Sequence, residues 1–161
     1  MALGDNTLQT ARGNSQRGRN PYMVEMELNF ATALSDKGSA LAASDVIPVI
    51  AVPKGNMVLN AGIEVDTASD GSTFTVDLGM VDADVFVDGF DATSAAAVVA
   101  QNPAAYQPVM AVANDNIDLT IATLSGGAVT TGKLRIWAVM MDCTDMGHDM
   151  TASLADRDYL A

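Results

Sequence analysis

The chain contains a single histidine and a single cysteine, the two side chains that most often supply a base and a nucleophile to a catalytic site. His148 stands beside Gly147 and Asp149 in a polar C-terminal stretch, where no regular element is expected to hold its geometry. Cys143 follows an apolar stretch and is expected to pack at the edge of the core. Because nucleophilic catalysis needs a base within hydrogen-bond reach of the nucleophile, we expect no enzyme and no catalytic residues.

Carboxylates are abundant, with 17 aspartates and three glutamates. Glycoside hydrolysis needs two of them flanking the scissile bond. The chain offers few aromatic side chains on which a sugar could stack, with one tryptophan and three tyrosines. Four aspartates close together raise the question of a calcium site: Asp82, Asp84, Asp88 and Asp91. Counted from Asp82, the fifth and sixth positions are Phe86 and Val87, where an EF-hand loop needs an oxygen ligand and a glycine. We therefore expect turn capping here, and no metal or cofactor.

Composition and charge narrow the class of protein further. The chain has 161 residues, of which 49% are hydrophobic, which suits one domain with a substantial core. Its net charge of −12 argues against a nucleic-acid partner, because binding phosphates requires a basic surface. No apolar run is long enough for a transmembrane helix, and one cysteine cannot form an internal disulfide. The expected protein is acidic and has neither a membrane nor a nucleic-acid partner.

The two ends of the chain differ from its middle. Residues 1–20 carry Arg12, Arg17 and Arg19 against one aspartate, without hydrophobic periodicity. This composition predicts a flexible N-terminal arm, either a solvated leader or a segment that orders against a neighbouring acidic or polar subunit. Residues 143–161 are again polar and acidic, and are expected to form a C-terminal tail.

The middle of the chain shows the alternation typical of strands. In residues 22–30, one face is apolar over nine residues, and its members are Tyr22, Val24, Met26, Leu28 and Phe30. Further strands are predicted at 45–52, 57–67, 73–78, 85–87, 106–112, 117–122 and 133–142. The last of these is expected to add Leu134, Ile136 and Ala138 to the core.

Glycine, proline and aspartate predict the connections between these strands. We expect a loop at 31–40, a tight turn at 53–56 and an Asp-Gly hairpin turn at 68–72. A second hairpin is expected to join 106–112 to 117–122, and Asp88-Gly89 to form a turn. Residues 93–100 are compatible with a short helix or with an extended cover segment.

Two residues within the predicted strands indicate where those strands lie or bend. Pro48 lacks an N–H, so its strand is expected at a sheet edge or at a bulge, and Gly62 is expected at a bulge or kink. Short strands with short turns and no βαβ rhythm predict an all-β fold, an antiparallel β-sandwich of jelly-roll type with extended N- and C-terminal arms. The expected boundaries are arm 1–20, domain 21–142 and tail 143–161.

Several segments resemble a known family when taken in order. They read VIPVIAVPKG, DGSTFTVDLG, DADVFVD and GKLRIWAVMMD, and they lie within residues 46–142. In these segments the chain resembles the capsid decoration, or cement, proteins of tailed bacteriophages and related virion structural proteins. The resemblance implies a small β-sandwich that forms homotrimers on the outer face of the major capsid protein shell. It does not extend to the two arms.

The function expected from this resemblance is to decorate and stabilise the phage head, with the major capsid protein and further copies of the chain as partners. The protein would be made in the bacterial cytoplasm and end on the capsid exterior. Arg12, Arg17 and Arg19 are the candidate contacts to capsid protein or to a neighbouring copy. Two alternatives remain, another virion part such as a neck, tail or fibre base, and a calcium- or carbohydrate-binding β-sandwich module.

Overall fold

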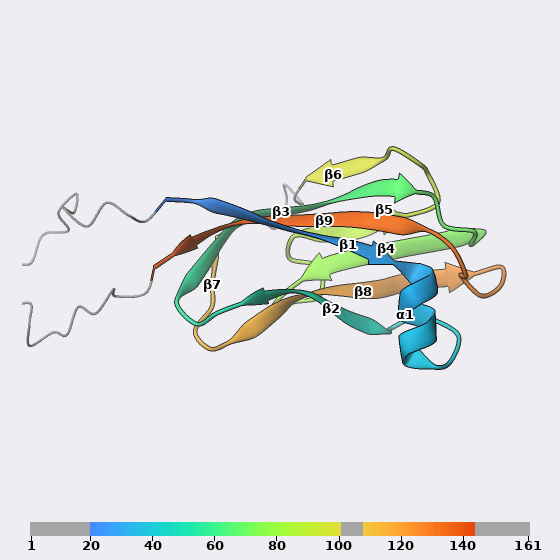
Figure 1. The fold of residues 1–161 in the computed structure, drawn as a ribbon, viewed down its shortest axis with the longest axis horizontal. Coiled ribbons are helices and arrows are strands. Elements are labelled where there is room, and N and C mark those ends of the chain that lie inside the picture. Colours follow the sequence, from blue (N-terminus) through green and yellow to red (C-terminus); the bar gives the residue numbers. More distant parts are fainter. Residues whose placement is uncertain (1–19, 101–107, 144–161) are drawn as a thin grey trace, which may run out of the picture.

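Two antiparallel sheets pack face to face in the computed structural model, which describes residues 20–100 and 108–143 (Figure 1). The first sheet has the order β1 (Tyr22–Asn29), β9 (Lys133–Asp142), β3 (Asn56–Thr67) and β6 (Val98–Ala100). The short β7 (Val109–Met110) also pairs with β3. The second sheet has the order β2 (Val46–Val52), β8 (Asp115–Ser125), β4 (Thr73–Gly79) and β5 (Val87–Asp91). One helix, α1 (Phe30–Lys37), completes the elements of the described residues.

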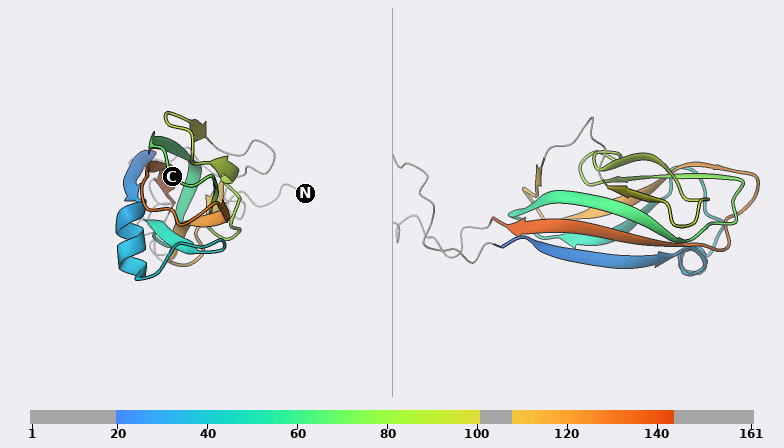
Figure 2. Two further views of the ribbon diagram at one scale, coloured as in Figure 1. Left: turned by 90° about the vertical axis from the view of Figure 1, so that its right-hand side faces the viewer. Right: turned by 90° about the horizontal axis from the view of Figure 1, so that it is seen from above.

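The strand order is that of a jelly roll. Leaving β7 aside, the first of the eight strands in the sequence pairs with the last, the second with the second last, and so on inward. The pairs are β1 with β9, β2 with β8, β3 with β6 and β4 with β5, all antiparallel. Such pairing is produced when one long hairpin of eight strands rolls up into two four-stranded sheets. Figure 2 shows β3, β9 and β1 side by side when the molecule is viewed from above. The predicted all-β sandwich of jelly-roll type is therefore confirmed.

The core lies between the two sheets and follows the predicted alternation. Leu28, Leu134, Ile136 and Ala138 are buried, while Val24 and Met26 pack against the core from a half-buried position. Phe30 is fully buried, and its ring meets that of Phe74 edge to face with centroids 4.9 Å apart. Burying such a ring stabilises the fold by about 1.5–3 kcal/mol, so this aromatic contact anchors the end of β1 to the opposite sheet.

The loop expected at residues 31–40 is wrong over its first seven residues, because α1 extends to Lys37. The side chain of Asn29 caps the helix by accepting a hydrogen bond from the Ala31 amide, 2.9 Å away. Gly38 ends the helix in the left-handed conformation, and its amide donates to the carbonyl oxygens of Leu34 and Ser35. In the sequence, this helix was indicated by an asparagine that can cap its start and by a glycine nine residues later that can end it.

Both predicted hairpins are wrong. The Asp-Gly segment at 68–72 joins β3 to β4, which belong to different sheets, so it is a crossover between layers. Likewise β7 pairs with β3, whereas β8 pairs with β2 and β4 in the other sheet. In this jelly roll most consecutive strands lie in different sheets, with β4 and β5 as a paired exception, and local turn residues do not reveal that exchange.

Two glycines also differ from expectation. Gly62 is paired in regular register with Trp137 and Ala100, and it neither bulges nor kinks the strand. A β-carbon at Gly62 would lie 2.5 Å from the Trp137 ring and 2.6 Å from the Val99 carbonyl oxygen, so the residue is small because its neighbours approach closely. Gly89 lies inside β5 with φ of 63°, where its amide donates to Asp77 beside the β4–β5 bulge, and not in a turn.

The remaining strand predictions have mixed outcomes. Pro48 lies in an edge strand and beside a register shift, as expected on both grounds. The segment 93–100 is extended at its end, where it forms β6. The strand expected at 85–87 is displaced to β5, and that expected at 106–112 is reduced in the described residues to β7. Residues 101–107 lie outside the described residues.

The start of β1 and the end of β9 lie at one end of the sandwich, since Tyr22 is paired with Met140 (Figure 1). We call this the terminal end, and the opposite end carries α1. The predicted arm 1–20 is described only at Asn20, and the predicted tail only at Cys143.

Candidate functional site

The residues singled out by the sequence lie largely beyond the described part. Arg12, Arg17, Arg19 and His148 are outside it, so their placement stays a prediction. Cys143 is half-buried, and its amide donates to the Gly55 carbonyl oxygen at 2.8 Å, which joins the end of β9 to the turn before β3. Within residues 20–100 and 108–143, therefore, no predicted functional side chains come together, and the surfaces of this part are defined by the fold.

The aspartates before and within β5 form a strongly acidic surface. The charge of Asp82 raises the pKa of Asp84 above its ordinary value, with smaller contributions from burial and Asp88. Repulsion of this kind would be relieved by a cation. Within residues 20–100 and 108–143, however, no three histidine, cysteine or acidic side chains are arranged to hold a metal ion.

Other aspartates bind neighbouring backbone and hydroxyl groups. Asp70 accepts hydrogen bonds from the Thr130 hydroxyl at 2.5 Å and from the amides of Thr130 and Thr131 at 2.8 and 3.1 Å. These bonds, chiefly that of the hydroxyl, lower the pKa of Asp70 to about 2. Asp91 accepts from the hydroxyl and amide of Thr93, which lowers its pKa as well. Both carboxylates therefore stabilise loops, and Asp91 does so as one of the four clustered aspartates expected to cap turns.

The outer face of the first sheet carries two cross-strand ion pairs. Lys133 on β9 donates to Glu27 on β1 at 2.9 Å, and Nε of Arg135 donates to Glu64 on β3 at 2.9 Å. Hydrogen bonding to these carboxylates raises the pKa of both basic side chains. The pairs join three adjacent strands, and the nearby Glu25 and Asp66 further raise the pKa of Arg135.

The terminal end exposes large apolar side chains. Four of the seven exposed large hydrophobic residues of the described part lie there, and together we call them the terminal surface: Tyr22 (40% exposed), Met23 (62%), Met110 (39%) and Val112 (82%). The Tyr22 hydroxyl donates to Asn56 at 2.6 Å, and the Ala111 amide donates to the Asn56 carbonyl oxygen, so one buried residue ties both sides of this end together. Exposed apolar side chains gathered in one region are typical of interaction surfaces.

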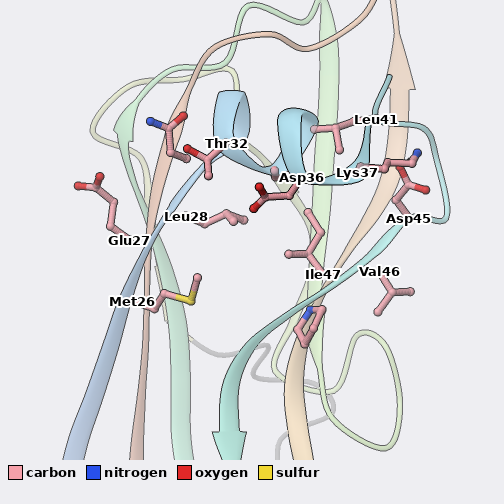
Figure 3. Close-up of a pocket in the computed structure, with 13 residues that line it drawn as sticks. Met26, Glu27, Leu28, Thr32, Asp36, Lys37, Leu41, Asp45, Val46 and Ile47 are labelled. Carbon is pink, nitrogen blue, oxygen red and sulfur yellow. The ribbon is translucent and has the colours of Figure 1, made fainter. Parts of the chain in front are cut away.

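A groove of about 640 Å³ lies between the edge strands β1 and β2, beneath α1 (Figure 3). Each of these strands is the outer member of its sheet, so the sandwich is open along this side. The apolar lining comes from all three elements and the loop after the helix, and includes Met26, Leu28, Ala33, Leu41 and Ile47. The lining is thus an apolar floor reached from the edge of the sandwich.

The rim of the groove is acidic. Its charged members are Glu27, Asp36, Lys37 and Asp45. Lys37 pairs with Asp45, which also accepts from the Ala42 amide, and Glu27 pairs with Lys133. Figure 3 shows Asp36 reaching from α1 over the space between the two strands. Among the described residues, Asp36 is the rim carboxylate that forms no ion pair.

Sequence reasoning missed the groove because it depends on α1 and on the β1–β2 juxtaposition, which join residues far apart in the chain. The cap residues Asn29 and Gly38 would have shown that Asp36 and Lys37 belong to a helix. Nothing local could have placed that helix over β2.

The comparisons with known proteins support the fold. The chain matches no protein-family model and no curated protein sequence. Its structure is similar to a chain in "Cyanophage Pam1 capsid asymmetric unit", with 16% identity, a TM-score of 0.58, and 87% of this chain and 97% of that chain covered. It is also similar to a chain in "Capsid of Ralstonia phage GP4", with 15% identity, a TM-score of 0.55, and 87% and 94% covered.

A third similar chain comes from "Acidic stable capsid structure of Helicobacter pylori bacteriophage KHP30", with 16% identity, a TM-score of 0.50, and 75% and 86% of the two chains covered. All three similarities extend over most of both chains. At these identities, what the chain shares with them is the fold. No helix among the described residues has the length and apolar character needed to cross a membrane.

Proposed function

We propose that this protein is a structural component of a phage capsid, a decoration protein that binds the outside of the major capsid protein shell and stabilises the head. The observation that carries the proposal is the jelly roll shared with chains from phage capsid structures over nearly their whole length. Jelly rolls recur in viral capsid proteins, because their rigid sheets offer surfaces for repeated contacts. The role needs no catalytic residue and no cofactor.

The terminal surface is the part of the molecule that we assign to the shell. It combines exposed apolar side chains with the points at which the chain enters β1 and leaves β9. Residues 1–19 and 144–161 are therefore attached beside it, and both are available to add contacts to the same partner. The acidic remainder would face solvent, where like charge keeps particles apart.

The test of this proposal is binding of the purified full-length protein to shells assembled from major capsid protein. The expected result is saturable binding at a ratio comparable with the number of capsid subunits, together with shells that resist heat better. Binding at only a few sites per shell would instead indicate a neck, tail or fibre-base component. Absence of binding would overturn the proposal.

A double variant identifies the surface involved. Met23→Asp with Val112→Asp places two charges on the terminal surface and is expected to weaken shell binding by about a hundredfold, since charges are depleted from interface cores. Val98→Asp is the control for a single charge placed elsewhere, because Val98 is 61% exposed on β6, at the far edge of the first sheet. Equal binding by the two variants would contradict the assignment of this surface.

A further inference from the structure

We propose that the groove between β1 and β2 receives the basic N-terminal segment, residues 1–19, of a second copy of this chain. The contact is between copies of the protein itself, so it goes beyond binding to a shell. Three features support this contact: the lining of the groove, the charge of its rim, and the length of the chain that precedes β1.

The groove and the segment have complementary chemistry. The floor offers apolar contacts from Met26, Leu28 and Ile47, of which Met26 and Ile47 are only half-buried. An extended segment that contains Leu3 and Leu8 could cover them. An apolar floor alone would accept many partners, so the charge of the rim is what selects one.

The rim supplies that selection through Asp36. Its carboxylate lies over the groove without a cationic partner in the described part, whereas the other rim carboxylates are paired. The segment carries Arg12, Arg17 and Arg19, and its charge of +2 contrasts with the −12 of the whole chain. A guanidinium group forms planar, two-point contacts with a carboxylate and therefore suits an acidic rim.

The direction of the chain favours a second copy over the segment's own groove. β1 begins at the terminal end and Pro21 favours extended backbone at Asn20, so a segment bound in its own groove would have to turn back before Asn20. The groove lies in the other direction, along β1 toward α1. Nineteen extended residues span up to about 60 Å, which is enough to reach a neighbouring copy whose terminal end rests on the same surface.

Photo-cross-linking of the full chain tests the contact directly. Ala33, which lines the groove from α1, is replaced by p-benzoyl-phenylalanine in a mixture of isotopically light and heavy copies. Mass spectrometry is expected to find cross-links from position 33 to residues 1–19 that join a light copy to a heavy one. Cross-links confined to single copies, or none to residues 1–19, would overturn the proposal.

Charge reversal tests the role of Asp36. In cross-linking chains that also carry Asp36→Lys, the yield between copies is expected to fall about tenfold, because a partly exposed ion pair is replaced by repulsion. Asp88→Lys makes the same charge change on β5, away from the groove, and is expected to leave the yield unchanged. Equal yields in the two variants would show that Asp36 receives no basic segment.

Complementation separates a contact between copies from one within a copy. A chain with Arg12→Glu, Arg17→Glu and Arg19→Glu is mixed with a cross-linking chain that carries Asp36→Lys. The altered charges then attract, and the lost cross-linking between copies is expected to return; failure to recover it would contradict the proposal. Because no capsid protein is present, failure here leaves the shell-binding result unaffected, and the reverse also holds.

Discussion

At the scale of single residues, the acidic side chains of this protein serve mainly as local acceptors. Asp70 holds the loop before β9, Asp91 holds the chain after β5, and Asp45 holds the loop after α1 through the Ala42 amide. Hydrogen bonds lower the pKa of all three carboxyl groups because they favour the ionised form, and at Asp45 the bond from Lys37 contributes most, followed by that from the Ala42 amide. The acidic composition thus contributes to the fold as well as to the surface charge.

Asp70→Ala is expected to lower the melting temperature at neutral pH. The folded-state pKa of about 2 lies below the ordinary value of 3.8, so the ionised carboxylate stabilises the fold above that value. This contribution declines as the pH falls through the folded-state pKa. Melting curves of both proteins from neutral pH to about pH 2 should therefore converge at the acidic end. A constant difference at every pH would rule out this linkage.

Gly62→Ala is expected to destabilise the protein by about 1–3 kcal/mol, as overpacking does in other tightly packed sites. The added methyl group would meet the Trp137 ring and the Val99 carbonyl oxygen, both closer than 3 Å. The ring can rotate, but the carbonyl oxygen belongs to the backbone, so β6 must shift. Urea unfolding and Trp137 fluorescence check the effect; unchanged stability would mean that β6 is not held against β3.

At the scale of elements, α1 is a short helix whose existence depends on its ends. Eight residues are too few for a stable isolated helix, so the Asn29 cap, the Gly38 terminus and the burial of Phe30 must hold it. The helix in turn places Asp36 and Lys37 on the rim of the groove. The groove is therefore sensitive to changes at the helix cap that touch none of its apolar lining.

Asn29→Ala is expected to reduce stability by about 1 kcal/mol, because the Ala31 amide loses its acceptor. Asn29→Asp is the matched control, since a carboxylate accepts the same bond and favours the positive end of the helix dipole. Chemical unfolding of the three proteins measures the effect. If alanine and aspartate behave alike, the cap does not contribute to stability.

At the scale of the whole molecule, the open side and the terminal surface leave the domain with two surfaces available to partners. We propose that the protein forms a homotrimer, which is the state expected of the family it resembles and one in which each copy can supply a segment to its neighbour. Sedimentation or light scattering of the full chain is expected to give three times 16.7 kDa. A monomer at micromolar concentration would contradict a trimer that forms before shell binding.

Much of the fold could be predicted because its strands follow local rules. Alternation of apolar side chains gave β1 to within a residue and β9 with its observed bounds, including the buried positions Leu134, Ile136 and Ala138. The proline at position 48 marked an edge strand beside a bulge, since a residue without an N–H cannot continue a ladder on that side. The all-β class, an antiparallel sandwich or jelly roll, followed from the number and spacing of such strands.

What the tertiary structure alone decided is which strands meet. The two hairpins expected from Asp70-Gly71 and from residues 106–122 do not form, because β3 and β4, like β7 and β8, lie in different sheets on the two sides of one core. The need for a glycine at position 62 becomes clear only from its contact with Trp137, which lies 75 positions later in the sequence. The groove exists because β1 and β2 end up as neighbouring edges beneath α1. Side-chain period is a local property of the chain, whereas strand pairing depends on how the whole chain shares its core.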